Sequence, residues 1–298
     1  GIAAIDARTA EVRALAGIAF SAPQPPGSTF KMITAAAGLE AGIVKPTTQF
    51  PVTTKAVIDG VDLENANGES CGGDFVESFA KSCNSVFAPL GVKLGAQRLV
   101  GAAERFGFNR TPAIAGAAMS TLPPAAAMTS PLEIGSTAIG QGKVLATPLQ
   151  MALIAHTIAT EGVQRVPTLI AGRPIGDGTR VIARRVARIV ERLMIAVVQR
   201  GTGTAASLAP VSVAGKTGTA ELQDTTGKQP PTDVVVNPGH DTDAWFAAYA
   251  PTRRPRIAVG VLFVRAGAGG ATAAPAARIV LQAGLLATAR DKPAGRSQ

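Results

Sequence analysis

The spacing of apolar residues changes twice along the chain, from the alternation of strands to the period of helices and back. This restricts the possible folds more than any other feature. Near the N-terminus, apolar residues at Ile2–Ile5 and Val12–Leu15 flank the polar turn 6–9, a pattern that predicts a β-hairpin. Period-two patterns return only near the other end, where they predict strands over 211–222, 243–251 and 256–264. Strands at both ends of the chain cannot form a repeating βαβ fold. They predict one sheet assembled from the two ends.

Between the two groups of strands the apolar residues follow a helical period, so we expect residues of about 43–206 to form an all-helical part inserted between the sheet halves. The expected helices cover 30–42, 75–82, 84–95, 96–107, 147–162 and 186–201, with a closing helix over 275–290. The predicted fold class is therefore α+β: a five-stranded, mostly antiparallel sheet flanked by helices. We found no internal repeat or clear linker, so residues 1–298 are expected to form a single domain, with a polar loop at 224–242.

Charge and composition narrow the classes of partner. The net charge is +9 and the isoelectric point about 10.2, but the arginines are dispersed and no aromatic-studded basic run occurs, so nucleic-acid binding is not favoured. No apolar run reaches the ~20 residues that a membrane span needs. The two histidines, His156 and His240, lie far apart without companion ligands, and neither a metal site nor a cofactor is expected.

The segment 25–31, PPGSTFK, pairs a serine with a lysine three residues later, on the same face of the predicted helix. A serine hydroxyl needs a neighbouring base to become a nucleophile, and Lys31 can serve Ser28 only if burial and a second cation lower its pKa. Taken alone, Ser28 is better explained as a helix N-cap, with Lys31 as a surface lysine. The segment Ser78–Lys81 has the same spacing, which shows how little this pattern means by itself.

Two further motifs change this assessment. Ser82 and Asn84 form an S-x-N motif, and Lys216, Thr217 and Gly218 form K-T-G in a predicted strand. The order S-x-x-K, S-x-N, K-T-G is the signature of active-site serine enzymes that act on penicillins and peptidoglycan. Lys216 would also supply the second cation that the proposed base requires.

The two cysteines, Cys71 and Cys83, lie 12 residues apart. This spacing allows a small disulfide loop, which would place the protein outside the cytoplasm. Two unpaired, buried thiols explain the sequence nearly as well.

With these motifs in place, the chain resembles the transpeptidase domain of penicillin-binding proteins over nearly its whole length. The segment 146–152, ATPLQMA, is typical of class B members, and among these the chain resembles the penicillin-binding protein A type. The resemblance implies that Ser28 is the acylated nucleophile, Lys31 its base and Ser82 a proton relay. It further implies that Asn84 holds the substrate amide.

The same resemblance implies that Lys216, Thr217, Gly218 and Thr219 form the strand that receives the terminal carboxylate, and that the backbone N–H groups of Ser28 and Thr219 form an oxyanion hole. Two departures stand out. The segment between the hairpin and Ser28 is short for the family. Cys83 inside S-x-N is unusual, and a link to Cys71 would tether the catalytic loop.

The expected activity is that of a peptidoglycan D,D-transpeptidase. Its partners would be stem peptides ending in D-Ala-D-Ala, β-lactam antibiotics and cell-wall synthesis machinery. The alternatives are a D,D-carboxypeptidase, a non-catalytic β-lactam sensor or a β-lactamase; the last is disfavoured because no glutamate lies in an E-x-x-L-N context. The chain opens inside a predicted strand, so we expect a membrane anchor and a non-catalytic domain to precede it. The catalytic domain would lie on the extracytoplasmic face.

Overall fold

The computed structural model describes residues 1–222 and 241–290; most of the polar loop predicted at 224–242 lies outside them. Its main feature is a five-stranded sheet in the order β2-β1-β11-β10-β9, in which all neighbouring strands are antiparallel. The strands are β1 (Ile2–Asp6), β2 (Val12–Ala16), β9 (Ala214–Glu221), β10 (Thr242–Ala250) and β11 (Ile257–Phe263). The sheet predicted from both chain ends is therefore confirmed.

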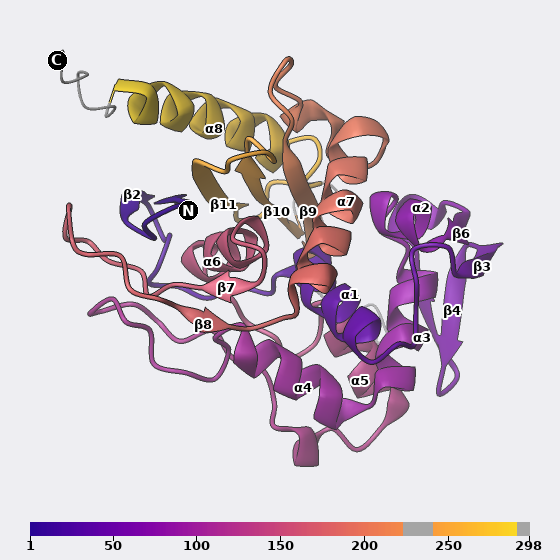
Figure 1. Ribbon diagram of the computed structural model, residues 1–298. Coiled ribbons are helices and arrows are strands. Elements are labelled where there is room, and N and C mark those ends of the chain that lie inside the picture. The colour runs from indigo at the N-terminus through magenta and orange to yellow at the C-terminus, as the bar shows by residue number, and fades with distance from the viewer. Residues whose placement is uncertain (223–240, 291–298) are drawn as a thin grey trace, which may run out of the picture.

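Helices cover both faces of this sheet (Figure 1). They are α1 (Lys31–Glu40), α2 (Phe75–Ala80), α3 (Asn84–Leu94), α4 (Ala96–Arg105), α5 (Pro131–Ala138), α6 (Pro148–Ala159), α7 (Arg184–Arg200) and α8 (Ala273–Arg290). The residues of β10 alternate between two cores: Trp245 and Tyr249 belong to the large core with α1, α6 and α7, whereas Phe246 and Ala248 pack with α8. This alternation is what a strand buried on both faces requires.

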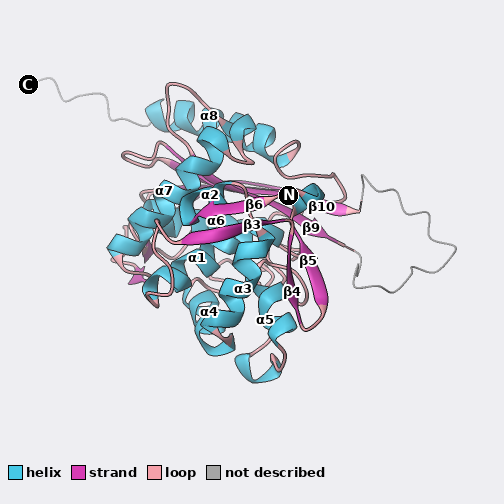
Figure 2. Cartoon of the chain, turned by 90° about the vertical axis from the view of Figure 1, so that its right-hand side faces the viewer, coloured by secondary structure: helices cyan, strands magenta, loops and turns pink. Residues whose placement is uncertain are grey.

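The inserted part is not all-helical, so that prediction was wrong. It contains three two-stranded sheets, which pair β3 (Gln49–Thr53) with β6 (Cys71–Asp74), β4 (Lys55–Ile58) with β5 (Val61–Glu64), and β7 (Val163–Gln164) with β8 (Thr179–Arg180). Figure 2 shows β3 to β6 as strands beside the helices of the insertion. These strands have two to five residues. The glycines of β6 and Pro51 of β3 interrupt the alternation of apolar and polar residues that would identify a strand.

The cross-strand register explains why the K-T-G strand faces the insertion. Lys216 on β9 pairs with Ala247, and Gly218 pairs with Trp245. Directly paired residues point to the same face of a sheet, and Trp245 and Ala247 both belong to the core shared with α1. The side chain of Lys216 is thereby directed toward the start of α1 and the loop before α3.

Candidate active site

Ser28 lies in a short 3-10 helix, η1 (Gly27–Phe30), directly before α1. The interpretation of Ser28 as a helix N-cap was wrong, because Pro26 stands at the N-cap of η1 and Phe30 at the N-cap of α1. Ser28 is half-buried, and within the described residues its hydroxyl has no hydrogen-bond partner. A partly exposed, unengaged hydroxyl is available to a substrate.

The backbone of η1 is pressed against β9. Gly27 has φ of +51°, and a Cβ there would lie 2.6 Å from the carbonyl oxygen of Thr219. A Cβ on Gly218 would lie 2.7 Å from the carbonyl oxygen of Pro26. Glycine is needed at both positions because any side chain would push the segment that carries Ser28 away from the K-T-G strand.

Lys31, in the first turn of α1, is fully buried and directed to the S-x-N motif. Its Nζ donates to the carbonyl oxygen of Ser82 at 2.6 Å, to Asn84 Oδ1 at 2.6 Å and to Ser82 Oγ at 3.3 Å. This Nζ also lies 5.5 Å from the centre of the Phe87 ring. The base proposed for Ser28 is thus held by the second motif.

Lys216 reaches the same serine from the sheet. It too is fully buried, and its Nζ donates to Ser82 Oγ at 2.8 Å and to the carbonyl oxygen of Thr217 at 3.1 Å. The Phe79 ring lies 5.6 Å from this Nζ. Ser82 Oγ therefore accepts hydrogen bonds from both lysines, and this one atom joins all three motifs.

Burial lowers the pKa of both lysines. The pKa of Lys31 lies well below its ordinary value, first because the site excludes water and second because of the charge of Lys216. Desolvation lowers the pKa of Lys216 to about 7. A neutral amine accepts a proton and an ammonium does not, so the site provides a base near neutral pH.

The loop that carries Ser82 is held in an uncommon conformation. Ser82 has φ of +64°, a region that costs a residue with a Cβ about 1 kcal/mol or more. Cys83, which follows, is bonded to Cys71 of β6, and the two Cα atoms lie 5.5 Å apart. Asn84 Nδ2 donates to the carbonyl oxygen of Glu64 at 2.7 Å. The disulfide and this bond hold S-x-N in addition to the contacts with the two lysines.

The K-T-G strand contributes hydroxyl groups. Thr217 Oγ1 lies 2.5 Å from Thr202 Oγ1, and Thr219 Oγ1 accepts from the backbone N–H of Gly269 at 3.2 Å. Thr202 was not predicted from the sequence; only its place in the segment 201–205, GTGTA, just before the K-T-G strand, could have drawn attention to it. The aromatic rings of Phe79 and Phe87 were missed as well, because core phenylalanines carry no signal of their own.

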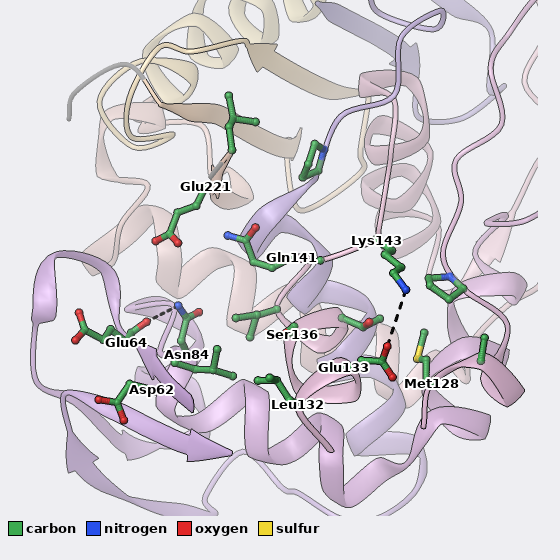
Figure 3. Close-up of a pocket in the computed structure, with 18 residues that line it drawn as sticks. Asp62, Glu64, Asn84, Met128, Leu132, Glu133, Ser136, Gln141, Lys143 and Glu221 are labelled. Atoms are coloured by element: carbon green, nitrogen blue, oxygen red, sulfur yellow. Dashed lines mark hydrogen bonds and ion pairs between the residues drawn. The ribbon is translucent and has the colours of Figure 1, made fainter. Parts of the chain in front are cut away.

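A cleft of about 830 Å³ opens beside this cluster (Figure 3). Asn84 lines it on one side and Glu221, at the end of β9, on another, with Gln141 between them. The charged side chains that line it are Asp62, Glu64, Glu133, Glu221 and Lys143. Two of these carboxylates form ion pairs, Asp62 with Lys55 at 2.5 Å and Glu133 with Lys143 at 4.0 Å.

The second S-x-x-K segment forms no such site. Ser78 is fully buried in α2, whereas Lys81 is half-exposed and forms an ion pair with Glu77 at 3.4 Å. In the described part of the chain, no group of three or more His, Cys, Asp and Glu side chains could hold a metal ion. Nor is any helix there long and apolar enough to cross a bilayer. The chemistry that the cluster offers is nucleophilic attack by a serine with a lysine as base.

Comparisons with known proteins agree with this geometry. The family model "Penicillin binding protein transpeptidase domain" matches residues 1–282. The peptidoglycan D,D-transpeptidase PbpA of Mycolicibacterium smegmatis is 36% identical over 293 residues, which cover 90% of this chain and 56% of the relative. The Mycobacterium tuberculosis protein of the same name is 35% identical over 300 residues, with the same coverages. The chain thus spans little more than half the length of these relatives.

Solved structures are similar over a larger share of their chains. Penicillin-binding protein A from M. tuberculosis superposes with a TM-score of 0.81 at 30% identity, covering 95% of this chain and 74% of that one. The ceftriaxone acyl-enzyme complex of the same protein gives a TM-score of 0.82 at 30% identity, covering 95% and 73%.

Proposed function

The chain belongs to the penicillin-binding protein transpeptidase family, and from this premise we propose that it is a peptidoglycan D,D-transpeptidase that forms an acyl-enzyme on Ser28. One observation carries the proposal: Ser82 Oγ accepts hydrogen bonds from both Lys31 and Lys216. This contact brings S-x-x-K, S-x-N and K-T-G into a single cluster next to a cleft.

In the first step, Ser28 Oγ attacks the carbonyl carbon between the two D-alanines of a stem peptide. Lys31, neutral because its pKa is lowered, accepts the hydroxyl proton. The C–N bond breaks, and Ser82 passes a proton to the departing amine, since its Oγ contacts both lysines. D-alanine leaves and Ser28 carries the acyl group. General acid–base help of this kind is worth roughly 10²- to 10⁴-fold in rate.

Binding groups surround the point of attack. Thr217, Gly218 and Thr219 would receive the terminal carboxylate beside the Lys216 ammonium, and Asn84 would bind the substrate amide. The backbone N–H groups of Ser28 and Thr219 would stabilise the developing oxyanion, for which loss of one donor typically costs about 3 to 4 kcal/mol. The close approach of Gly27 to Thr219 supports this arrangement, because it brings those two backbones together.

In the second step, an amine from a neighbouring stem peptide attacks the acyl-enzyme and the cross-link forms. The cleft supports an amine acceptor, since the carboxylate of Glu64 on its lining would attract an ammonium group. Lys31 takes the proton from the attacking amine and returns it to Ser28 Oγ as the bond between Ser28 and the acyl group breaks. A β-lactam would be opened by the same serine and would remain bound as a stable acyl group.

The proposal extends to location. A Cys71–Cys83 disulfide persists in oxidising compartments, and a peptidoglycan substrate lies outside the cytoplasm. We therefore place the activity on the extracytoplasmic face of the cell membrane, with a membrane anchor outside the given sequence and cell-wall synthesis machinery as partners. Residues 1–298 would form the one catalytic domain.

The direct test supplies a donor peptide ending in D-Ala-D-Ala together with an amine acceptor, and separates the products by mass spectrometry. We expect a cross-linked product whose yield rises with acceptor concentration and which Ser28→Ala does not form. Release of D-alanine without cross-linking at any acceptor concentration would instead make the protein a carboxypeptidase. Acylation without any turnover would make it a sensor.

A further inference from the structure

A second hollow, of about 740 Å³, lies away from the cleft. It is bounded by the C-terminal end of α6, the middle of α7 and the turn 251–255 between β10 and β11. It shares no lining residue with the cleft beside Asn84. The catalytic proposal therefore makes no use of it.

The acidic groups of this hollow are already engaged. Glu161 forms ion pairs with Arg184 at 2.5 Å and with Arg188 at 2.8 Å. Glu191 accepts a hydrogen bond from the hydroxyl of Tyr249 at 2.6 Å. Each carboxylate of the hollow thus has a partner other than Arg192, Arg253 and Arg254, which also line it.

The lining of the hollow holds four arginines against two carboxylates, so it keeps a positive charge. Arg192 on α7 and Arg253 and Arg254 on the turn line the hollow, are exposed, and have no ion pair or side-chain hydrogen bond to any described residue. The turn itself is fixed, because the N–H of Thr252 donates to the carbonyl oxygen of Ser212 at 3.1 Å. Arg254 has φ of +57°, a conformation that a non-glycine residue adopts at some cost.

We propose that this hollow binds a phosphate ester. Arg192 on α7 and Arg253 and Arg254 on the turn line the same hollow, and guanidinium groups bind phosphate oxygens in pairs. The volume accommodates the phosphate together with the group that it esterifies. Such a phosphate occurs in an anionic lipid head group or in a soluble phosphodiester polymer, and the guanidinium groups would bind either.

The test compares two double variants that remove the same charge. Arg253→Gln/Arg254→Gln changes the hollow, whereas Arg110→Gln/Arg173→Gln changes two arginines that are exposed and do not line it. Binding of inorganic pyrophosphate is measured by calorimetry. Binding to vesicles is measured by co-sedimentation, with phosphatidylglycerol vesicles compared with phosphatidylcholine vesicles. The thermal unfolding transition of each variant, followed by circular dichroism, checks that it is folded.

We expect the hollow variant to bind pyrophosphate about tenfold or more weakly, because two charge-assisted contacts are lost, and the control variant to bind within about twofold of the parent. If Arg253→Gln/Arg254→Gln also weakens binding to phosphatidylglycerol vesicles, the phosphate that the hollow binds belongs to a lipid head group. If it weakens binding only to pyrophosphate, that phosphate belongs to a soluble molecule. Equal losses in both variants, or no binding to any of these probes, would overturn the proposal. Neither result depends on whether the transpeptidase proposal holds.

Discussion

Replacing Lys216 by Met should remove a measurable part of the pH dependence of stability. The pKa of Lys216 is about 7 in the fold, against about 10.4 for an unfolded lysine. Between these two values the unfolded chain holds a proton that the folded chain has released, so stability rises with pH. Below pH 7 both states are protonated, and the full penalty of burying the charge is present. The penalty disappears as the pH approaches 10.4.

The size of the effect follows from these two values. Each pH unit in the window adds up to about 1.4 kcal/mol to the free energy of unfolding, and at pH 7 the folded lysine is only half deprotonated. From pH 7 to pH 9 the wild-type protein should therefore gain about 2 kcal/mol more than Lys216→Met. Urea titrations at the two pH values measure this difference. The control is Lys45→Met at an exposed position, which should gain as much as wild type.

The same variant has a kinetic consequence. Removing the charge of Lys216 takes away one of the two causes that lower the pKa of Lys31, so the acid limb of the acylation rate should move to higher pH. The contrary outcome is that Lys216→Met gains as much stability as wild type between pH 7 and pH 9 and keeps the acid limb of its pH–rate profile at the same pH. These two results together would refute the argument that two buried, interacting lysines form the site.

Two further perturbations test the positioning of the site. Replacing Cys71 and Cys83 by Ala should lower the free energy of unfolding by about 3 kcal/mol on the loop-entropy account of a 12-residue separation; a change below about 1 kcal/mol in urea titration would speak against it. Gly218→Ala places a Cβ 2.7 Å from the carbonyl oxygen of Pro26, so it should destabilise the protein by about 1 to 3 kcal/mol and slow acylation. At Gly101 in α4, an added Cβ would meet no atom within 4 Å apart from its chain neighbours and its own helix backbone. Gly101→Ala should therefore leave acylation unchanged and stabilise the protein by up to about 1 kcal/mol; equal effects of the two substitutions would contradict the close-approach argument.

The sequence predicted the elements with a strong period. The hairpin at the N-terminus, the three strands near the C-terminus and helices such as α6 and α7 lie where the apolar spacing places them. The short strands of the insertion could not be predicted, because β6 reads CGGD and offers no alternation. Helix α5 was not predicted either, although Ser130 and Glu133 form a capping box at its start.

For the site, the order of three motifs predicted residues that the fold brings together. Ser82 lies 54 residues after Ser28 and Lys216 a further 134 after Ser82, yet Lys31 and Lys216 contact one hydroxyl. What could not be predicted were contacts that depend on the packed fold. The 3-10 turn at Ser28 and the approach of Gly27 to β9 arise from packing between segments distant in sequence.

The central claim, that Ser28 is the acylated nucleophile, is tested most directly by intact mass. The chain and its Ser28→Ala variant are incubated with benzylpenicillin, sampled over hours and then digested to locate the adduct. We predict one stable penicilloyl group on wild type, carried by the peptide that contains Ser28, and none on the variant. An adduct that persists on Ser28→Ala, or hydrolysed penicillin with the wild-type mass restored within minutes, would contradict the account.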